Sequence, residues 1–229
     1  MTVDAFLLMT SNNRVLKELL VPEATNWLMD KHLFPVIHNC SHVLTDIDLS
    51  NCSQLSSLSL HSLAANCRNL TKVSLKGCAW VGKDNFKQLV INNPGLRKID
   101  VSWCWLLDDG CLINAAISCP FLEEIILSNT RIASDSSLQI IAMKCKGLKH
   151  LSVRGCWHVT NCGIRAIGYH CKNLKILHVS DCRDVTESSL ARLRVRGVAM
   201  DVPVPSENSL IEEENGLNFI IKPYVCLQI

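Results

Sequence analysis

The stretch Leu148-Lys-His-Leu-Ser-Val-Arg-Gly-Cys156 returns 26 residues later as Leu174-Lys-Ile-Leu-His-Val-Ser-Asp-Cys182. Both copies hold an aliphatic residue at the first, fourth and sixth positions and a cysteine at the ninth. Self-similarity at a fixed period of about 20–50 residues indicates a solenoid, in which each unit packs on the next. This short pattern therefore decides the fold.

The ninth-position cysteine recurs along most of the chain. It forms a ladder of equivalent positions at Cys52, Cys78, Cys104, Cys156 and Cys182, with Thr130 in the one vacant place. A second series with the same period holds Cys67, Cys119, Cys145 and Cys171, with Asn93 in its gap. Together with the leucine that opens each unit, these series predict about seven repeats, starting near residues 16, 44, 70, 96, 122, 148 and 174.

Each unit has two halves with different periodicities. Leu177 and Val179 alternate with polar residues, which is typical of a strand that turns every second side chain inward. Ile164 and Ile167 have helical spacing. Strands lie about 4.8 Å apart and packed helices about 8–10 Å, so a stack of such units must curve with its strands inside. The pattern predicts an α/β leucine-rich-repeat solenoid, a right-handed horseshoe arc with a parallel concave sheet and convex helices.

The repeats account for most of the chain. We expect a short leader at residues 1–15, a leucine-rich-repeat domain at 16–202 and a C-terminal tail at 203–229. Pro203 and Pro205 end the last strand, and apolar residues return near the C-terminus. Because the open end of a solenoid needs a cover, the tail is expected to cap it.

The cysteines also raise the question of metal or disulfide chemistry. No Cys-x-x-Cys pair occurs in the sequence, whereas structural zinc sites usually need closely spaced ligand pairs. In a solenoid each ladder cysteine has an equivalent neighbour in the next repeat rather than a dedicated partner. Cysteine also behaves as a small apolar residue with a weak S–H donor. We therefore expect reduced, structural thiols and neither a metal nor another cofactor.

Composition and charge bound the remaining possibilities. The net charge of +2 and the pI near 7.9 argue against a dedicated nucleic-acid-binding protein, which would carry a strongly basic face. No apolar run approaches the roughly 20 residues needed to cross a bilayer, and residues 1–10 do not resemble a signal peptide. We expect a protein of the cytoplasm or nucleus with no membrane partner. The eight histidines fall in no catalytic motif, so we do not expect an enzyme.

The outward strand positions and the turns that follow them supply the candidate binding residues. These are Lys98, Trp103, Trp105, Glu124, His150, Arg154 and Trp157, all predicted to contact a protein substrate on the concave face and its rim. Trp105 and Trp157 occupy equivalent positions two repeats apart, and Arg131 and Arg183 hold the same slot in their own repeats. Tryptophan and arginine are common anchors of protein interfaces. The alternatives are a solvated strand face and tryptophan rings that simply cover the turns.

The cysteine-containing pattern at period 26 resembles the repeats of the F-box/leucine-rich-repeat family, over about residues 16–229. The resemblance implies that this chain is related to the substrate-recognition subunits of SCF-type (Skp-cullin-F-box) ubiquitin ligases. Such a subunit recruits a protein for ubiquitination. An N-terminal F-box docks on the Skp adaptor, and the repeats hold the substrate. The Skp adaptor and cullin are therefore implied as partners only if an F-box lies upstream.

The N-terminal region departs from the family pattern. Only about fifteen residues precede the first repeat, which is too few for an F-box, and residues 1–13 show no Leu-Pro start. We expect the F-box to be missing from this chain. Two further interpretations stay open, a scaffold or inhibitor outside the ligase and a short form that competes with a full-length F-box protein.

Overall fold

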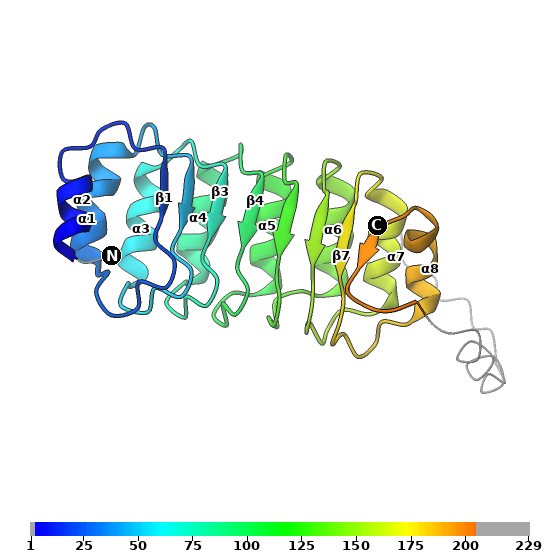
Figure 1. The fold of residues 1–229 in the computed structure, drawn as a ribbon. Coiled ribbons are helices and arrows are strands. Elements are labelled where there is room, and N and C mark those ends of the chain that lie inside the picture. Colours follow the sequence, from blue (N-terminus) through cyan, green and yellow to red (C-terminus); the bar gives the residue numbers. More distant parts are fainter. Residues whose placement is uncertain (1–2, 205–229) are drawn as a thin grey trace.

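The computed structural model describes residues 3–204, which form a single row of strands backed by a row of helices (Figure 1). Within this part of the chain the strands make one parallel sheet in the order β1 to β8, so strands that are consecutive in the chain are neighbours in the sheet. The strands are β1 Glu18–Leu20, β2 Asp46–Asp48, β3 Lys72–Ser74, β4 Lys98–Asp100, β5 Glu124–Ile126, β6 His150–Ser152, β7 Ile176–His178 and β8 Ala199–Met200. Each strand pairs in register with its equivalent one repeat later, as Leu151 does with Leu177.

A helix follows each of the first seven strands, and one more precedes β1. The helices are α1 Val3–Thr10, α2 Asp30–Cys40, α3 Ser57–Asn66, α4 Lys83–Asn92, α5 Asp109–Ser118, α6 Asp135–Lys144, α7 Asn161–His170 and α8 Glu187–Val195. Helices α2 to α8 lie side by side on one face of the sheet, which leaves the other face open (Figure 1). None of the helices in residues 3–204 has the length and apolarity to cross a membrane.

Helix starts follow the repeat as closely as the strands do. The residue before helices α3, α5, α6 and α7 is Ser56, Asp108, Ser134 or Thr160, and in each case its side chain accepts a hydrogen bond from a backbone N–H of the first turn. Those N–H groups have no partner within the helix, so the caps fix where each helix begins. The core lies between the two layers and is built from the aliphatic residues of the repeat, nearly all of them fully buried.

The ladder cysteines line the turn after each strand. The thiol of Cys78 donates to the carbonyl of Leu49 at 3.1 Å, Cys104 to Leu75 at 3.1 Å and Cys182 to Val153 at 3.0 Å. Each thiol thus bonds to the backbone of the preceding repeat. Thr130 keeps a hydroxyl in the vacant place. It donates to the carbonyl of Leu127 in its own repeat at 2.7 Å and lies 3.6 Å from the thiol of Cys156 in the next repeat. The ladder ties one repeat to the next.

Asn93 is the corresponding substitute in the second series. Its amide nitrogen donates to the carbonyls of Cys67 and Leu89, and its side-chain oxygen accepts from the N–H of Leu70 at 2.9 Å. Asn93 is fully buried, so these bonds satisfy a polar group that would otherwise be costly to bury. It therefore joins its own repeat to the one before it, as Cys119 joins its repeat to Val90 and Asn93.

The two ends of the described chain depart from the repeat. Helix α1 lies in the predicted leader, where the sequence pattern did not indicate a helix, and Phe6 packs its ring 5.3 Å from that of Trp27. At the other end, Arg194 donates to the carbonyls of Val202 and Pro203 and so holds the chain beside α8. The rest of the predicted tail, residues 205–229, lies outside the described residues, and its capping role stays a prediction.

Burial makes the thiols unreactive. It raises the pKa to about 12 at Cys67, Cys104, Cys119 and Cys145. Burial also raises the pKa of the ladder cysteines Cys78, Cys156 and Cys182. Since the thiolate is the nucleophile, the native protein at pH 8 should leave most cysteines of the ladder and of the second series unmodified by a thiol reagent. The same titration in denaturant should find close to thirteen free thiols, the number in the sequence. Stoichiometric zinc in the purified protein would contradict the structural role.

Candidate functional site: the open face of the sheet

A hollow of about 320 Å³ lies on the open face, lined by residues in or directly after strands β3 to β7. It is lined by Lys76, Asp100, Ser102, Trp103, Ile126, Ser128, Asn129, Arg154 and Asp181. The volume falls at the lower end of what ligand-binding clefts occupy, and it is enough for one or two side chains of a partner. The hollow is therefore a candidate docking point on the open face of the sheet.

The hollow exists because one row of the repeat places two short side chains between two long ones. Residues 76, 102, 128 and 154 occupy equivalent positions, and the serines at 102 and 128 lie between Lys76 and Arg154. The serines form a low, hydrogen-bonded floor: the Ser128 hydroxyl lies 2.8 Å from that of Ser152, and the Ser128 N–H donates to Ser102 Oγ at 3.1 Å. Two long cationic side chains thus flank a polar floor.

Trp103 lines the hollow from a backbone conformation that a bulky side chain rarely adopts. Its φ is +63°, in the left-handed region. The equivalent positions hold residues that tolerate this region, namely Asn51, Gly77, Asn129, Gly155 and Asp181, all with positive φ. A tryptophan here is strained, and such outliers concentrate at functional sites. Its indole is 43% exposed, so packing in the core does not account for it.

Two further tryptophans continue along the rim. Trp105 is 52% exposed and meets Trp103 edge to face, with ring centroids 5.5 Å apart. Trp157 is 50% exposed, and the guanidinium of Arg183 lies 4.9 Å from its ring centroid. Trp80 differs, because it is partly buried and donates from Nε1 to the carbonyl of Cys52 at 2.7 Å. Trp103, Trp105 and Trp157 therefore offer apolar surface to a partner, whereas Trp80 packs on its own chain.

Many of the charges on this face already have partners within the chain. Glu123 bridges Arg97 and Lys149, each at 2.6 Å, and its pKa is lowered by Lys149 and Arg97. Lys98 pairs with Glu124 at 2.9 Å. Exposed pairs of this kind contribute little to stability, but they hold both signs in a fixed pattern that a partner can complement.

The charges at the hollow are less completely paired. Arg154 reaches Asp181 at 3.3 Å, and both side chains are more than half exposed. Within residues 3–204, Lys76 has no ion pair. Lys76 is thus the cation at the hollow that is most available to a partner.

His150 and His178 meet on the same face although they are two residues out of register. The register pairs His150 with Ile176 and Ser152 with His178. The rings nevertheless lie edge to face, with His150 Nε2 3.4 Å from His178 Nδ1. Burial, together with the charge of His178, lowers the pKa of His150 below its ordinary value. One imidazole must be neutral for the pair to share a hydrogen bond.

The histidine pair should make stability depend on pH. Because the folded pKa of His150 is lowered, the unfolded chain takes up a proton that the folded chain resists as the pH falls below about 6.5. The free energy of unfolding should therefore decrease from pH 7 to pH 5. His150→Gln should flatten this slope in urea titrations at several pH values, whereas His61→Gln, at an exposed position on α3, should leave it unchanged. An unchanged slope in His150→Gln would contradict this assignment.

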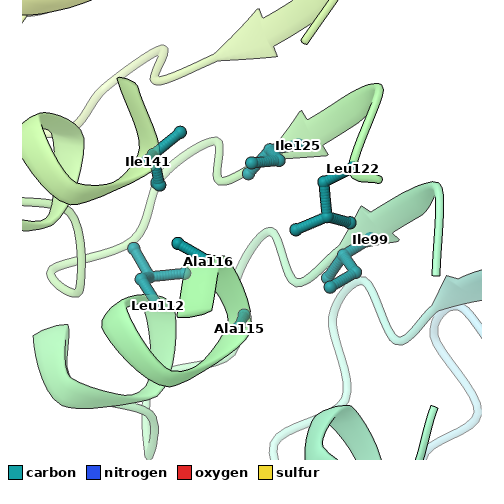
Figure 2. Close-up of a pocket in the computed structure, with 7 residues that line it drawn as sticks. All are labelled: Ile99, Leu112, Ala115, Ala116, Leu122, Ile125 and Ile141. Carbon is teal, nitrogen blue, oxygen red and sulfur yellow. The ribbon is translucent and has the colours of Figure 1, made fainter. Parts of the chain in front are cut away.

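A second cavity lies in the interior rather than on the open face. It is bounded by Ile99, Leu112, Ala115, Ala116, Leu122, Ile125 and Ile141 (Figure 2). The space is about 10 Å³, and its lining is aliphatic throughout. A cavity of this size barely admits one water, and apolar cavities stay dry. It is a small packing gap between the helices and the sheet, not a ligand site.

The structure brings some of the predicted residues together. Trp103 and Arg154 line the same hollow, and Trp103 and Trp105 are in contact. Lys76, Ser102 and Ser128 are also outward strand positions by the repeat register, at 26-residue spacing to Arg154, but they were not among the candidate binding residues. The two serines indicate a hollow only when residues 76, 102, 128 and 154 are known to form one row on the same face.

No protein-family model matches the sequence. The backbone is similar to that of a chain in the crystal structure of the Rad7 and Elc1 complex in yeast, with a TM-score of 0.70 and 18% identity. That match covers 78% of this chain but 45% of the yeast chain, so the protein spans less than half of its neighbour's length. The C-terminal domain of tropomodulin from Caenorhabditis elegans aligns with a TM-score of 0.46 and 11% identity, over 69% of this chain and 96% of that one.

The chain is a leucine-rich-repeat solenoid. Parallel strands and helices alternate throughout residues 18–200, as the cysteine and leucine series predicted, and the yeast neighbour shares this arrangement. The predicted fold class is confirmed. At this level of identity the similarity concerns the fold alone, and any function has to be argued from the residues of this chain's own candidate site.

Proposed function

We propose that this solenoid is a protein–protein interaction module that holds a protein substrate on its open face. The observation that carries the proposal is the strained, half-exposed Trp103 beside a hollow flanked by Lys76 and Arg154. A conformationally costly aromatic residue that faces solvent is better explained by a partner than by folding. Lys98, Trp105, Glu124, His150 and Trp157 then contact the same partner around it.

In its finer form, the proposed role is that of the substrate-recognition part of an SCF-type ubiquitin ligase. This rests on the resemblance of the repeats to the F-box/leucine-rich-repeat family. The segment from Ser189 to Gly197 and the ending Leu227-Gln228-Ile229 resemble one small member, F-box/LRR-repeat protein 15. The repeats would present the substrate, and other subunits would transfer ubiquitin, so the chain itself is proposed to be non-catalytic. The Skp adaptor and cullin would join through an F-box, in the cytoplasm or nucleus.

Affinity capture with the full chain tests the proposed face. Quantitative mass spectrometry should find proteins whose capture falls at least tenfold for Arg154→Glu and for Trp157→Ala. The same proteins should be retained by Arg165→Glu, a matched charge reversal on the exposed side of α7. If Arg165→Glu abolishes capture while the open-face variants leave it intact, the partner binds the helices instead.

The ligase role needs a separate measurement. Proteins that depend on the open face should accumulate in cells when cullin ligases are inhibited, and purified Skp adaptor should not bind this chain directly. Direct binding of the adaptor would show that residues 1–43 contain a docking motif that the sequence pattern did not reveal. Substrates that bind but are never ubiquitinated would favour the scaffold or competitor role.

A further inference from the structure

We propose that the rim of the solenoid binds an extended, proline-containing acidic segment of the partner in the polyproline II conformation. The binding surface is the row Trp105, Arg131, Trp157 and Arg183, here called the rim row. This inference deepens the proposed function and rests on it, because it specifies the kind of segment that the open face would recognise.

The rim row is periodic in a way that suits such a segment. Its members directly follow the ladder position of four consecutive repeats and alternate between tryptophan and arginine. The same slot holds Ser53 and Ala79 in the two preceding repeats, so the row has a defined end. Parallel strands lie about 4.8 Å apart, which places the two tryptophans about 10 Å apart. A polyproline II helix repeats every three residues, about 9.3 Å, so prolines at i and i+3 match the two rings.

The tryptophans have the exposure that proline recognition requires. Trp105 and Trp157 are each about half exposed, at 52% and 50%, so part of each side chain is packed on the chain and part is accessible to a partner. Trp103 supports Trp105 from the hollow, and Arg183 stacks on Trp157. Proline-rich segments dock on rows of exposed aromatic rings. The proline rings stack on the flat apolar faces of the aromatic rings, and the backbone of the segment is already extended before it binds.

The arginines of the rim row give the expected charge of the segment. Arg131 and Arg183 are exposed, and neither forms an ion pair within residues 3–204. Arg131 lies in the slot between the two tryptophans, so a carboxylate carried between two prolines would reach its guanidinium. Arginine binds carboxylates through paired N–H donors, which adds specificity to the apolar contacts. A basic segment would instead bring like charges together.

Fluorescence anisotropy with three labelled peptides tests the inference on the full chain. The probe is (Pro-Pro-Glu)4, and the controls are (Gly-Ser-Glu)4, with the same charge and length but a flexible backbone, and (Pro-Pro-Lys)4, with the opposite charge. The first peptide should bind at least tenfold more tightly than either control. Trp157→Ala and Arg131→Ala should each weaken it at least fivefold, while Arg165→Ala on the exposed side of α7 should change it less than twofold.

The other outcomes contradict either this inference or the proposed function, and they can be told apart. Equal binding of (Pro-Pro-Glu)4 and (Gly-Ser-Glu)4 would mean that the rim row binds anionic segments in general, without preference for polyproline II. If none of the peptides binds, the rim row is not a peptide-binding surface of this kind. If the peptides fail while Trp157→Ala still abolishes capture of a cellular partner, the proposed function stands and only the polyproline inference is lost. If (Pro-Pro-Glu)4 binds but open-face variants capture partners normally, the proposed function fails instead.

Discussion

Replacing Leu151 with alanine is expected to lower the free energy of unfolding by about 2–5 kcal/mol. Leu151 is the central residue of β6, is fully buried, and pairs in register with Ile125 and Leu177. Truncation removes apolar contacts and leaves a cavity in a layer where neighbouring strands are fixed by the repeat, so the site cannot collapse. Urea denaturation monitored by circular dichroism measures the change.

The effect should spread along the solenoid because each repeat is stabilised by the next. Hydrogen exchange should therefore accelerate in β5 and β7 as well as in β6. Lys175 is an exposed residue directly before β7. The free energy of unfolding of Lys175→Ala should stay within about 0.5 kcal/mol of that of the unchanged protein. A loss below 1 kcal/mol for Leu151→Ala, or faster exchange confined to β6, would argue against a cooperative stack of repeats.

The fold could be predicted from the sequence because every repeat packs on the next one through the same set of positions. Once Leu148 and Leu174 occupy equivalent positions, in-register pairing of their strands follows, and so does the burial of Leu151 and Leu177. The role of the ladder cysteines could be predicted for the same reason, since a residue that recurs at one slot must suit one environment. Helix α1 lies before the first repeat, so the repeat pattern does not extend to it, and its eight residues are mostly apolar, without the spacing that marks a helix.

The candidate site was predictable only in part, because it depends on differences between repeats. The exposure of Trp105 and Trp157 follows from their slot after the ladder cysteine. The left-handed backbone at Trp103 was visible in principle, since Asn, Gly and Asp fill the equivalent positions, but it takes the structure to assign a common φ to them. The contact between His150 and His178 depends on ring orientation across the register, which no sequence pattern specifies.

Trp103→Gly is expected to separate binding from folding. Glycine adopts a positive φ without steric cost, so the free energy of unfolding should stay unchanged or rise by up to about 1 kcal/mol. Loss of a half-exposed aromatic anchor should weaken partner binding by about 2 kcal/mol or more, which is a factor of roughly 30 in the dissociation constant. Paired denaturation and binding titrations on the same preparation measure both quantities.

A matched substitution isolates the contribution of the indole. Asn51→Gly changes the equivalent position two repeats earlier, where φ is also positive, but Asn51 does not line the hollow. It should leave partner binding within twofold of the original value. If Trp103→Gly instead destabilises the fold by more than 1 kcal/mol and leaves binding intact, the tryptophan covers the turn and has no part in recognition. If Trp103→Gly keeps its stability but loses binding, the unfavourable backbone conformation at position 103 serves recognition, because Trp103 contacts the partner.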